Sequence, residues 1–338
     1  MKKPAGKAGG STRRAFGTMS LLGAAALAFF ATSASAEWQP TKNVELLVGA
    51  GPGGGNDRIA RALQQVMQDK KLVPTPVVVM NKPGAGGTVA LGYLNQHAGD
   101  GHYLMVQNPA MVTNSMLGVG TATYSDATPV AQLMADYIVL IGRKGLAHET
   151  GSDVFKALKA DPKSLSIAVA PGLGTGPHMA VALLAQTAGV EPSALHVIPF
   201  ASASEAITAI LGGQIDLMPS TGGNVQGNIE AGSIKGYGIT APQRMSGVLS
   251  DIPTFREQGI DVVFNNWRAV IGPKNLPADQ LAYWEGVFEK VNSDPEWQKI
   301  ATQSFLVPDY HGSAEFGAFL EAEAKESKDL LTGLGLIK

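Results

Sequence analysis

The chain contains no cysteine among its 338 residues. That absence excludes disulfide bonds, a thiol nucleophile, a thiolate metal site and a lipid-modified N-terminal cysteine. Charged residues are also few, at 16%, whereas hydrophobic residues make up 45% of the chain. This balance is typical of a well-packed globular protein. The six histidines show no H-E-x-x-H or other paired spacing, so the sequence predicts no metal site.

The first 36 residues have the pattern of an export signal. A basic head precedes an apolar run, Leu21–Phe30, and the small residues Ala34-Ser35-Ala36, after which a signal peptidase would cut. A membrane anchor is the weaker interpretation, because so short a run does not cross a hydrocarbon core of about 30 Å. The mature chain is therefore expected to start at Glu37.

The basic head leaves two export routes open. Arg13 and Arg14 lie in a segment, residues 12–16, that is similar to the start of a twin-arginine signal. An ordinary basic head that holds two adjacent arginines explains the same residues, so the general secretory (Sec) route is the alternative. Both routes deliver a protein outside the cytoplasm.

Removal of the signal makes the chain acidic. Of the 26 Lys and Arg, five lie in residues 1–36 and no acidic residue does, so 21 remain against 28 Asp and Glu, a net charge of −7. Nucleic acid and anionic membrane surfaces are therefore not expected as partners. The 302 residues that remain of 338 are enough for two domains. The five lost basic residues are Lys2, Lys3, Lys7, Arg13 and Arg14.

From Val44 onward, short apolar runs alternate with segments of helical periodicity, which predicts an α/β fold. The first such unit predicts a mainly parallel sheet with helices on both faces. One long apolar strand, Pro129–Ile141, is expected to enter a second α/β unit, and Val262–Ile271 is expected to return. The predicted strands are 44–48, 77–80, 103–107, 166–170, 196–198, 215–218 and 237–240, and the predicted helices are 57–67, 88–94, 153–160, 177–188, 204–211, 277–291, 295–302 and 314–331.

Two such units joined by two crossings predict two lobes with a cleft between them. Domain I is expected to comprise residues 37–137 plus 263–338, and domain II residues 138–262. Ligands of such sheets bind beyond the carboxyl ends of the strands, so the cleft is the expected site. We expect a monomer whose lobes close on the ligand about a hinge.

Glycine is abundant, at 41 residues, and gathers in loops after apolar runs. The loop Gly49–Asn56 formally satisfies G-x-G-x-x-G, but a dinucleotide site also needs an acidic residue after the second strand, where the chain has Met80-Asn81-Lys82. No Gly-Lys-Ser or Gly-Lys-Thr triplet occurs, as a Walker phosphate loop requires. No cofactor is therefore expected.

The glycine loops instead predict an anion site built from the main chain. Gly53, Gly54, Gly55 and Asn56 offer N–H groups at the positive end of a helix. Residues 84–88 and 172–178 form similar loops, and three such loops facing one cleft would hold an anion without a basic pocket. The alternative is that each loop is a tight turn between a strand and a helix.

Six motifs, in this order along the chain, resemble those of one receptor family. Together they cover almost the whole mature chain and resemble the solute receptors of tripartite tricarboxylate transporters, also called the Bug family. The motifs are Pro52-Gly-Gly-Gly-Asn-Asp57 with Ala60-Arg61, Asn81-Lys-Pro-Gly-Ala-Gly-Gly87, Asp100-Gly-His-Tyr-Leu104, Leu211-Gly-Gly-Gln-Ile-Asp-Leu-Met218, Ala231-Gly-Ser-Ile-Lys235 and Asp251-Ile-Pro-Thr254.

The resemblance implies a two-lobed, type II-like periplasmic binding protein with two crossing strands and an interlobe cleft. Such a receptor captures a small organic carboxylate, of the tricarboxylate or dicarboxylate type, and delivers it to the membrane permease subunits of the transporter. In the family, backbone amides, hydroxyls and water hold the carboxylate more than arginine does. Carried over by position, the ligand contacts are Gly53, Gly54, Gly55, Asn56 and Asn108 in the first lobe and Gly174, Thr175, Gly176, His178, Phe200, Ala201, Ser202 and Ser220 in the second.

Several residues keep two interpretations. Asp57 is expected to cap the first helix, with Arg61 as its partner or as a surface residue, because a carboxylate beside the ligand would repel it. Arg268 either faces the distal end of a polyanionic ligand or pairs with an acid at the hinge. His178 either donates to a carboxylate or only starts a helix. Residues 199–202 lack the phenol and amine of many relatives, so the distal half of the ligand stays open.

Two other functions stay open. A receptor that presents its ligand to a sensor kinase instead of a permease fits the same residues, and the sequence does not separate these partners. A dispersed Ser-His-Asp set would permit a hydrolase or transferase. The chain has no G-x-S-x-G elbow and no cysteine, so we expect no enzyme.

Overall fold

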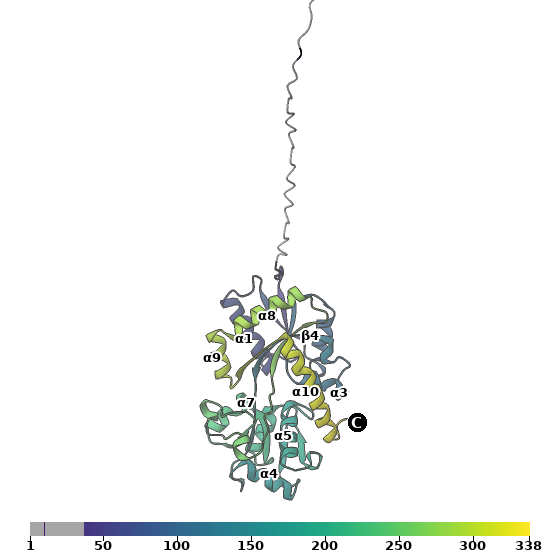
Figure 1. Ribbon diagram of the computed structural model, residues 1–338. Coiled ribbons are helices and arrows are strands. Elements are labelled where there is room, and N and C mark those ends of the chain that lie inside the picture. Colours follow the sequence, from purple (N-terminus) through teal and green to yellow (C-terminus); the bar gives the residue numbers. More distant parts are fainter. Residues whose placement is uncertain (1–9, 11–36) are drawn as a thin grey trace, which may run out of the picture. The chain divides into compact units, whose positions relative to one another are not determined.

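The computed structural model describes residue 10 and residues 37–338, so the predicted export signal and its cleavage site lie outside the described residues apart from Gly10. Residues 37–338 form one compact unit. This unit contains two β-sheets, each covered by helices (Figure 1). No helix within the described part of the chain has the length and hydropathy that a membrane span requires.

The first sheet has six strands in the order β11-β4-β10-β3-β1-β2. β1 is parallel to β2 and β3, whereas β10 is antiparallel to β3 and β4, and β11 is antiparallel to β4. The predicted parallel arrangement is confirmed for β1, β2 and β3, but the whole sheet is mixed, because β10 and β11 pair with their neighbours in the antiparallel direction. The strands are β1 (Val44–Val48), β2 (Val77–Asn81), β3 (Tyr103–Gln107), β4 (Ala127–Ala135), β10 (Arg268–Pro273) and β11 (Val307–Gly312).

The second sheet has five strands in the order β7-β6-β8-β5-β9. β6 is parallel to β7 and β8, and β5 is antiparallel to β8 and β9. This sheet is mixed as well, because β5, the strand that enters it from the first sheet, runs opposite to its two neighbours. The strands are β5 (Ile138–Arg143), β6 (Ser166–Val169), β7 (His196–Pro199), β8 (Leu217–Thr221) and β9 (Ile234–Ile239).

Both faces of each sheet are covered by helices. Leu46 of β1 packs with α1, α8 and α9, whereas the next residue, Leu47, packs with α2, α3 and α10. Successive strand residues point to opposite faces, so an unbroken apolar run predicts a strand buried on both sides. In the second sheet α4 and α5 cover one face and α6 and α7 the other. The helices are α1 (Gly55–Asp69), α2 (Thr88–Asn95), α3 (Ala110–Met116), α4 (Gly151–Ala160), α5 (Gly176–Thr187), α6 (Ala203–Leu211), α7 (Gly222–Glu230), α8 (Ala278–Asn292), α9 (Pro295–Gln303) and α10 (Ser313–Gly333).

Three elements have no counterpart among the predicted ones. α3 is a short helix, α7 begins with a glycine pair that the pattern assigns to a loop, and β11 lies between two helices. The run Pro129–Ile141 was also expected to be one strand, but it forms two, β4 and β5, in different sheets. The break falls at Asp136 and Tyr137, where the chain passes from one sheet to the other.

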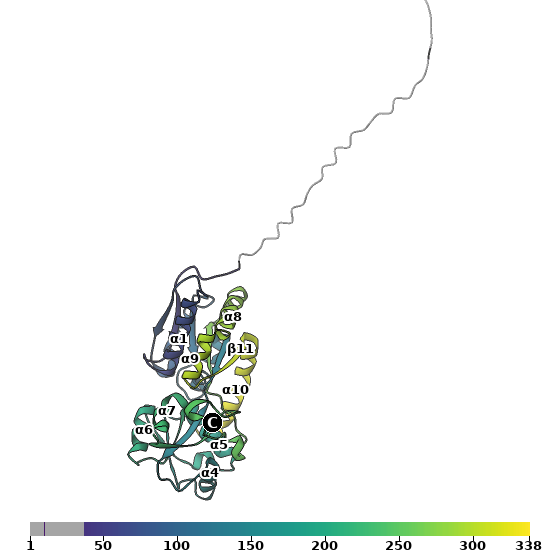
Figure 2. The same ribbon diagram turned by 90° about the vertical axis from the view of Figure 1, so that its left-hand side faces the viewer.

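Three segments join the two lobes, which we define as the two sheets with their covering helices. The two crossing segments lie side by side, since Tyr137 forms an isolated bridge with Asn265, and the Asn266 N–H donates to the Asp136 carbonyl at 3.1 Å. The third is α10, which runs from the first sheet to α5 (Figures 1 and 2). α10 lies within the residues assigned to domain I, and it contacts α5 of the second lobe as well as β4 of the first. The domain boundaries at 137/138 and 262/263 stay a prediction.

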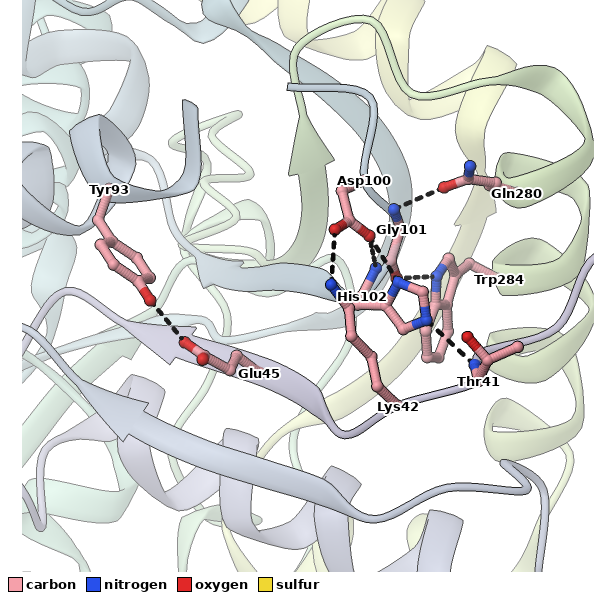
Figure 3. A network of polar contacts seen from close by, with 9 residues as sticks. All are labelled: Thr41, Lys42, Glu45, Tyr93, Asp100, Gly101, His102, Gln280 and Trp284. Carbon is pink, nitrogen blue, oxygen red and sulfur yellow. Dashed lines mark hydrogen bonds and ion pairs between the residues drawn. The ribbon is translucent and has the colours of Figure 1, made fainter. Parts of the chain in front are cut away.

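A polar network fixes the first residues of the 37–338 unit to the first lobe (Figure 3). The Thr41 N–H donates to His102 Nε2 at 3.1 Å, and His102 Nδ1 contacts the Asp100 carboxylate. Gly101 lies between Asp100 and His102 in the sequence. Its N–H donates to the Gln280 side chain of α8, and its carbonyl accepts from Trp284 Nε1 of the same helix. Because a backbone amide occupies Nε2, this Asp-His pair is not arranged to serve a serine nucleophile.

Candidate ligand-binding site

A cavity of ≈ 510 Å³ lies where the two lobes meet. Its walls follow the carboxyl ends of β1, β3, β6 and β8, which is where ligands of such sheets bind. The first lobe and the crossings contribute Gly53, Gly54, Gly55, Arg58, Ile59, Asn108, Ala110, Asp136, Asn266, Arg268, Ile300, Ser304 and Leu306. The second lobe contributes Ala170, Pro171, Thr175, Gly176, Pro177, Ala203, Ser204, Ser220, Thr221, Gly223 and Asn224.

Four helices of nine or more residues begin at this cavity. α1 comes from the first lobe, and α5, α6 and α7 come from the second. The first N–H groups of a helix have no acceptor within it, and the aligned peptide dipoles place partial positive charge at the same end. The cavity wall therefore favours a negatively charged ligand that both lobes contact.

The buried side chain of Asp57 hydrogen-bonds to the loop before α1. One carboxylate oxygen accepts from the Gly53 N–H at 2.8 Å and from Arg61 Nε at 2.9 Å, and the other accepts from Asn81 Nδ2 at 2.9 Å. These bonds, that from Arg61 above all, lower the pKa of Asp57 to about 2. The expected capping role is correct in part, because Asp57 is the third residue of α1 and reaches back to Gly53, whereas Gly54 is the N-cap.

The bond from Gly53 to Asp57 changes the predicted anion loop. The Gly53 N–H is occupied by Asp57, and the Gly54 N–H lies 3.4 Å from the Gly51 carbonyl. As the first two residues of α1, Gly55 and Asn56 have N–H groups without an acceptor in the helix. The ligand-facing donors of this loop are therefore fewer than the four that the sequence predicts.

The loop before α5 uses some of its polar groups internally. The Gly174 N–H donates to His178 Nδ1 at 2.9 Å, and the Thr175 hydroxyl donates to the Gly172 carbonyl at 2.7 Å. His178 is buried, and burial lowers the pKa of its ring to about 4, so the ring is neutral at pH 7. Thr175 and Gly176 line the cavity, whereas Gly174 and His178 do not.

Residues 200–202 lie behind the cavity wall. The Ser202 hydroxyl caps α6 by accepting from the Glu205 N–H at 3.2 Å, the Ala201 N–H lies 3.3 Å from the Glu205 carboxylate, and the Phe200 N–H donates to a β6 carbonyl. None of the three lines the cavity, although the next two residues do. Among the other predicted contacts, Asn108 and Ser220 line it and Asn56 does not.

The loop 84–88 does not line the cavity, so the expectation of three loops facing one cleft is wrong. Its glycines serve close packing, since a Cβ on Gly49 would lie 2.6 Å from the Gly87 Cα. Asn114 of α3 also donates to the Gly86 carbonyl at 3.0 Å. For this loop the tight-turn interpretation holds, because only glycine permits the two backbones to approach so closely.

Charged side chains line the cavity as well: Arg268, which was among the predicted ligand contacts, and Arg58 and Asp136, which were not. Arg268 Nη2 lies 2.6 Å from Asp136 Oδ2, and Nη1 donates to the Asn266 carbonyl at 2.6 Å. Arg268 therefore pairs with an acid at the crossing, as one interpretation expected, and its contact with a ligand stays a prediction. Burial raises the pKa of Asp136 to about 6 even though Arg268 lowers it.

Sequence reasoning missed two of these residues, Asp136 and Arg58. Asp136 had a signal, because it is the one charged residue in the apolar run 129–141. Arg58 had none, since it occupies an exposed position on a helix; its Nη1 donates to the Gly53 carbonyl at 2.9 Å. Within residues 37–338, Arg58, Asp136 and Arg268 are the ionisable residues of the cavity wall.

Comparison with known proteins agrees with this geometry. A protein from Pseudomonas sp. strain P51, described as a UPF0065 protein in the tcbD–tcbE intergenic region, is 29% identical over 261 residues, 75% of this chain and 73% of that protein. The periplasmic binding protein BugD has a TM-score of 0.72 at 24% identity, over 88% of this chain and 99% of its own. MatC from Rhodopseudomonas palustris with bound malate has a TM-score of 0.70 at 24% identity, over 86% and 99%. These two likenesses show the fold of a two-lobed periplasmic binding protein.

A family model spans most of the chain. Residues 59–336 match the family described as tripartite tricarboxylate transporter family receptor. The proteins of this family are binding receptors, so the enzyme interpretation has no support here. The chain belongs to the tripartite tricarboxylate transporter receptor family.

Proposed function

We propose that this protein is a receptor that captures a small organic carboxylate in the cavity between its lobes. The observation that carries this proposal is the set of four helix N-termini, from both lobes, around one cavity. A carboxylate that bridges them completes hydrogen bonds that neither lobe supplies alone, so its binding favours the closed arrangement. The malate bound to the similarly folded MatC supports a carboxylate of the dicarboxylate or tricarboxylate type.

The proposed partners are the membrane permease subunits of a tripartite tricarboxylate transporter, to which the receptor delivers its ligand. The family description supports this partnership. We propose the periplasm as the place of work, which the likeness to BugD and the signal-like pattern of residues 1–36 support. We also propose a monomer with domains at 37–137 plus 263–338 and at 138–262.

The proposed ligand contacts are the predicted residues that line the cavity, except Gly53, whose N–H is bonded to Asp57. In the first lobe and the crossing we propose the main chain at Gly54 and Gly55 and the side chains of Asn108 and Arg268. In the second lobe we propose the α5 N-terminus at Thr175 and Gly176 and the side chain of Ser220.

The first experiment is a thermal-shift screen of the purified protein against mono-, di- and tricarboxylic acids, with their neutral amides as controls. A compound that binds only the native state raises the melting temperature. The proposal expects at least one carboxylate to raise it while its amide does not, and calorimetry then measures Kd. A screen in which only neutral compounds stabilise the protein would contradict the proposal.

The variant Gly54→Asp tests the cavity itself. A Cβ on Gly54 meets no atom nearer than 3.4 Å, and Asp is a favoured N-cap residue, so the fold should be kept or slightly stabilised. The new carboxylate repels a bound anion, and we expect affinity for the best acid to fall by roughly tenfold or more.

Gly92→Asp is the matched control, because Gly92 in α2 has open space around it and lies outside the cavity. It adds the same charge elsewhere and should leave affinity unchanged. Equal affinities of the two variants would place the ligand away from the α1 N-terminus.

A further inference from the structure

The cavity wall contains a carboxylate with one unpartnered oxygen. Asp136 Oδ2 accepts from Arg268 Nη2 at 2.6 Å, whereas Oδ1 forms no hydrogen bond within the described chain. The side chain of Asp136 is only 6% exposed. Oδ1 is therefore free to accept a hydrogen bond from a molecule in the cavity, and a ligand that brings a donor to this charged acceptor gains affinity.

The same carboxylate opposes a ligand that brings only negative charge. Arg58 and Arg268 are the other ionisable residues of the wall. The ionised Asp136 offsets the charge of Arg268, so a carboxylate that binds beside this pair loses much of the attraction that Arg268 alone would provide. Repulsion between like charges at short range is strong where water is excluded.

Arg268 also faces the helix that starts in the first lobe. Its Nη2 lies 3.7 Å from the position that a Cβ on Gly55 would take, beside the first N–H groups of α1. A ligand carboxylate between Arg268 and this N-terminus therefore lies next to Asp136. Arg268 Nη2 and the Asp136 carboxylate are only 2.6 Å apart. A ligand that accepts from Arg268 and also donates to Asp136 must therefore carry its acceptor and its donor on neighbouring groups.

We propose that Asp136 and Arg268 select a carboxylic acid that carries a hydroxyl or ammonium group on the carbon beside its carboxylate. Arg268 and the α1 N-terminus hold the carboxylate, and Asp136 Oδ1 accepts a hydrogen bond from the neighbouring hydroxyl or ammonium group. This inference rests on the proposed function, since it concerns the specificity of the same cavity.

The protonation state of Asp136 gives a second measurable consequence. Its pKa of about 6 makes it ionised at neutral pH and therefore an acceptor. An acid without the donor places a charge beside Asp136 and favours its protonated form, so its binding near pH 6.5 takes up a proton. A 2-hydroxy or 2-amino acid leaves Asp136 ionised and takes up less.

The test uses matched acids on the wild-type protein, with Kd measured by calorimetry. The series are propionate, lactate and alanine; succinate, malate and aspartate; adipate, 2-hydroxyadipate and 2-aminoadipate; and tricarballylate and citrate. In the series that binds most tightly, we expect the substituted acid to bind at least about tenfold more tightly than its parent, as one charge-assisted hydrogen bond provides. The hydroxy and amino members show which donor is used. Calorimetry in two buffers of different ionisation enthalpy measures proton uptake and needs no variant.

The variant Asp136→Asn tests whether Asp136 causes this preference. We expect it to reduce the ratio of the affinity for the substituted acid to that for its parent acid to about threefold or less. Asp216→Asn is the matched control, because Asp216 also pairs with an arginine, Arg143 at 2.8 Å, but lies outside the cavity. It should keep the wild-type ratio.

Parent acids that bind as tightly as their substituted partners would overturn this inference and leave the proposed function standing. Proton uptake that is equal for both, or an unchanged ratio in Asp136→Asn, would also overturn it, and binding of no acid at all would overturn both proposals.

Discussion

Two aspartate–arginine ion pairs lie at or next to the cavity. Both have short N···O distances, but the arginines differ in exposure and the aspartates in the direction of their pKa shifts. In the pair Asp57–Arg61 the N···O distance is 2.9 Å, and the arginine side chain is 51% exposed whereas the aspartate side chain is only 2% exposed. In the pair Asp136–Arg268 the distance is 2.6 Å, and the two side chains are only 6% and 9% exposed. The pKa of Asp57 is lowered to about 2, whereas that of Asp136 is raised to about 6.

Both aspartate side chains are buried, so the number of hydrogen bonds that each carboxylate accepts accounts for the opposite directions of the two pKa shifts. Asp57 has an arginine in water and further donors from the main chain and from Asn81, so its ionised form is favoured. Asp136 loses its hydration almost completely, and one arginine does not replace it. The Asp57–Arg61 pair holds the loop before α1 in place. The Asp136–Arg268 pair lines the cavity, and its aspartate changes charge near pH 6.

The largest change is expected from Arg268→Met, which removes the cation and leaves Asp136 buried alone. The free energy of unfolding at pH 8 should fall by about 3–5 kcal/mol. Urea denaturation measures it, and the double variant Arg268→Met/Asp136→Leu should regain most of the loss because no unpaired charge remains. A single variant within about 1 kcal/mol of the wild type would show that the pair is weaker than its burial implies.

The pH profile of stability should separate the two pairs. The folded-state pKa of Asp136 is raised from 3.8 to about 6, so the folded state binds more protons than the unfolded state in that window. Its contribution therefore falls as pH rises from 3.8 to 6, by roughly 1–3 kcal/mol. The pKa of Asp57 is lowered from 3.8 to about 2, so its contribution is complete above 3.8 and is lost as pH falls toward 2, an effect of at most about 2 kcal/mol.

Asp136→Asn and Asp57→Asn, each compared with the wild type by thermal unfolding from pH 2 to 8, check these signs. The difference should change between pH 4 and 6 for the first variant and below pH 4 for the second. Differences that change in the same window for both variants would remove the contrast.

The smallest effect is expected from Arg61→Ala. Its side chain is half exposed, and ion pairs with an exposed partner contribute little to stability because water and salt screen them. Asp57 keeps its bonds from Gly53 and Asn81, so its pKa should rise only part of the way toward 3.8. An NMR titration of the Asp57 carboxyl group measures this, and a pKa that stays near 2 would mean that Gly53 and Asn81 set it without Arg61.

The sequence predicted the α/β alternation because consecutive apolar residues, such as Leu46 and Leu47, are buried on opposite faces of one strand. Strand direction was not predictable in the same way, since it depends on pairings such as β10 with β3 between distant segments. α7 was missed because a glycine pair at its start gives a loop signal. Local patterns thus identify elements, and long-range pairing determines their order and direction.

The candidate site was predictable where its parts are local. The glycine loops before α1 and α5 mark helix starts, and both reach the cavity. The occupation of the Gly53 N–H was not predictable, because it depends on the conformation of the Asp57 side chain. Asp136 stood out in its apolar run, but its partner Arg268 is 132 residues away in the sequence, and no periodic pattern connects them.

The packing of α10 against α5 restricts how the cavity can open. Leu330 and Leu331 of α10 lie in one buried cluster with Met179 and Ala182 of α5, and α5 also begins at the ligand cavity. A wide swing of the lobes would strip these side chains of their contacts, whereas a slide of one helix along the other would keep them. Entry and release of a ligand are therefore expected to shift the two helices lengthwise by small steps, so a pair of spin labels on their outer faces would report occupancy at a distance from the pocket itself.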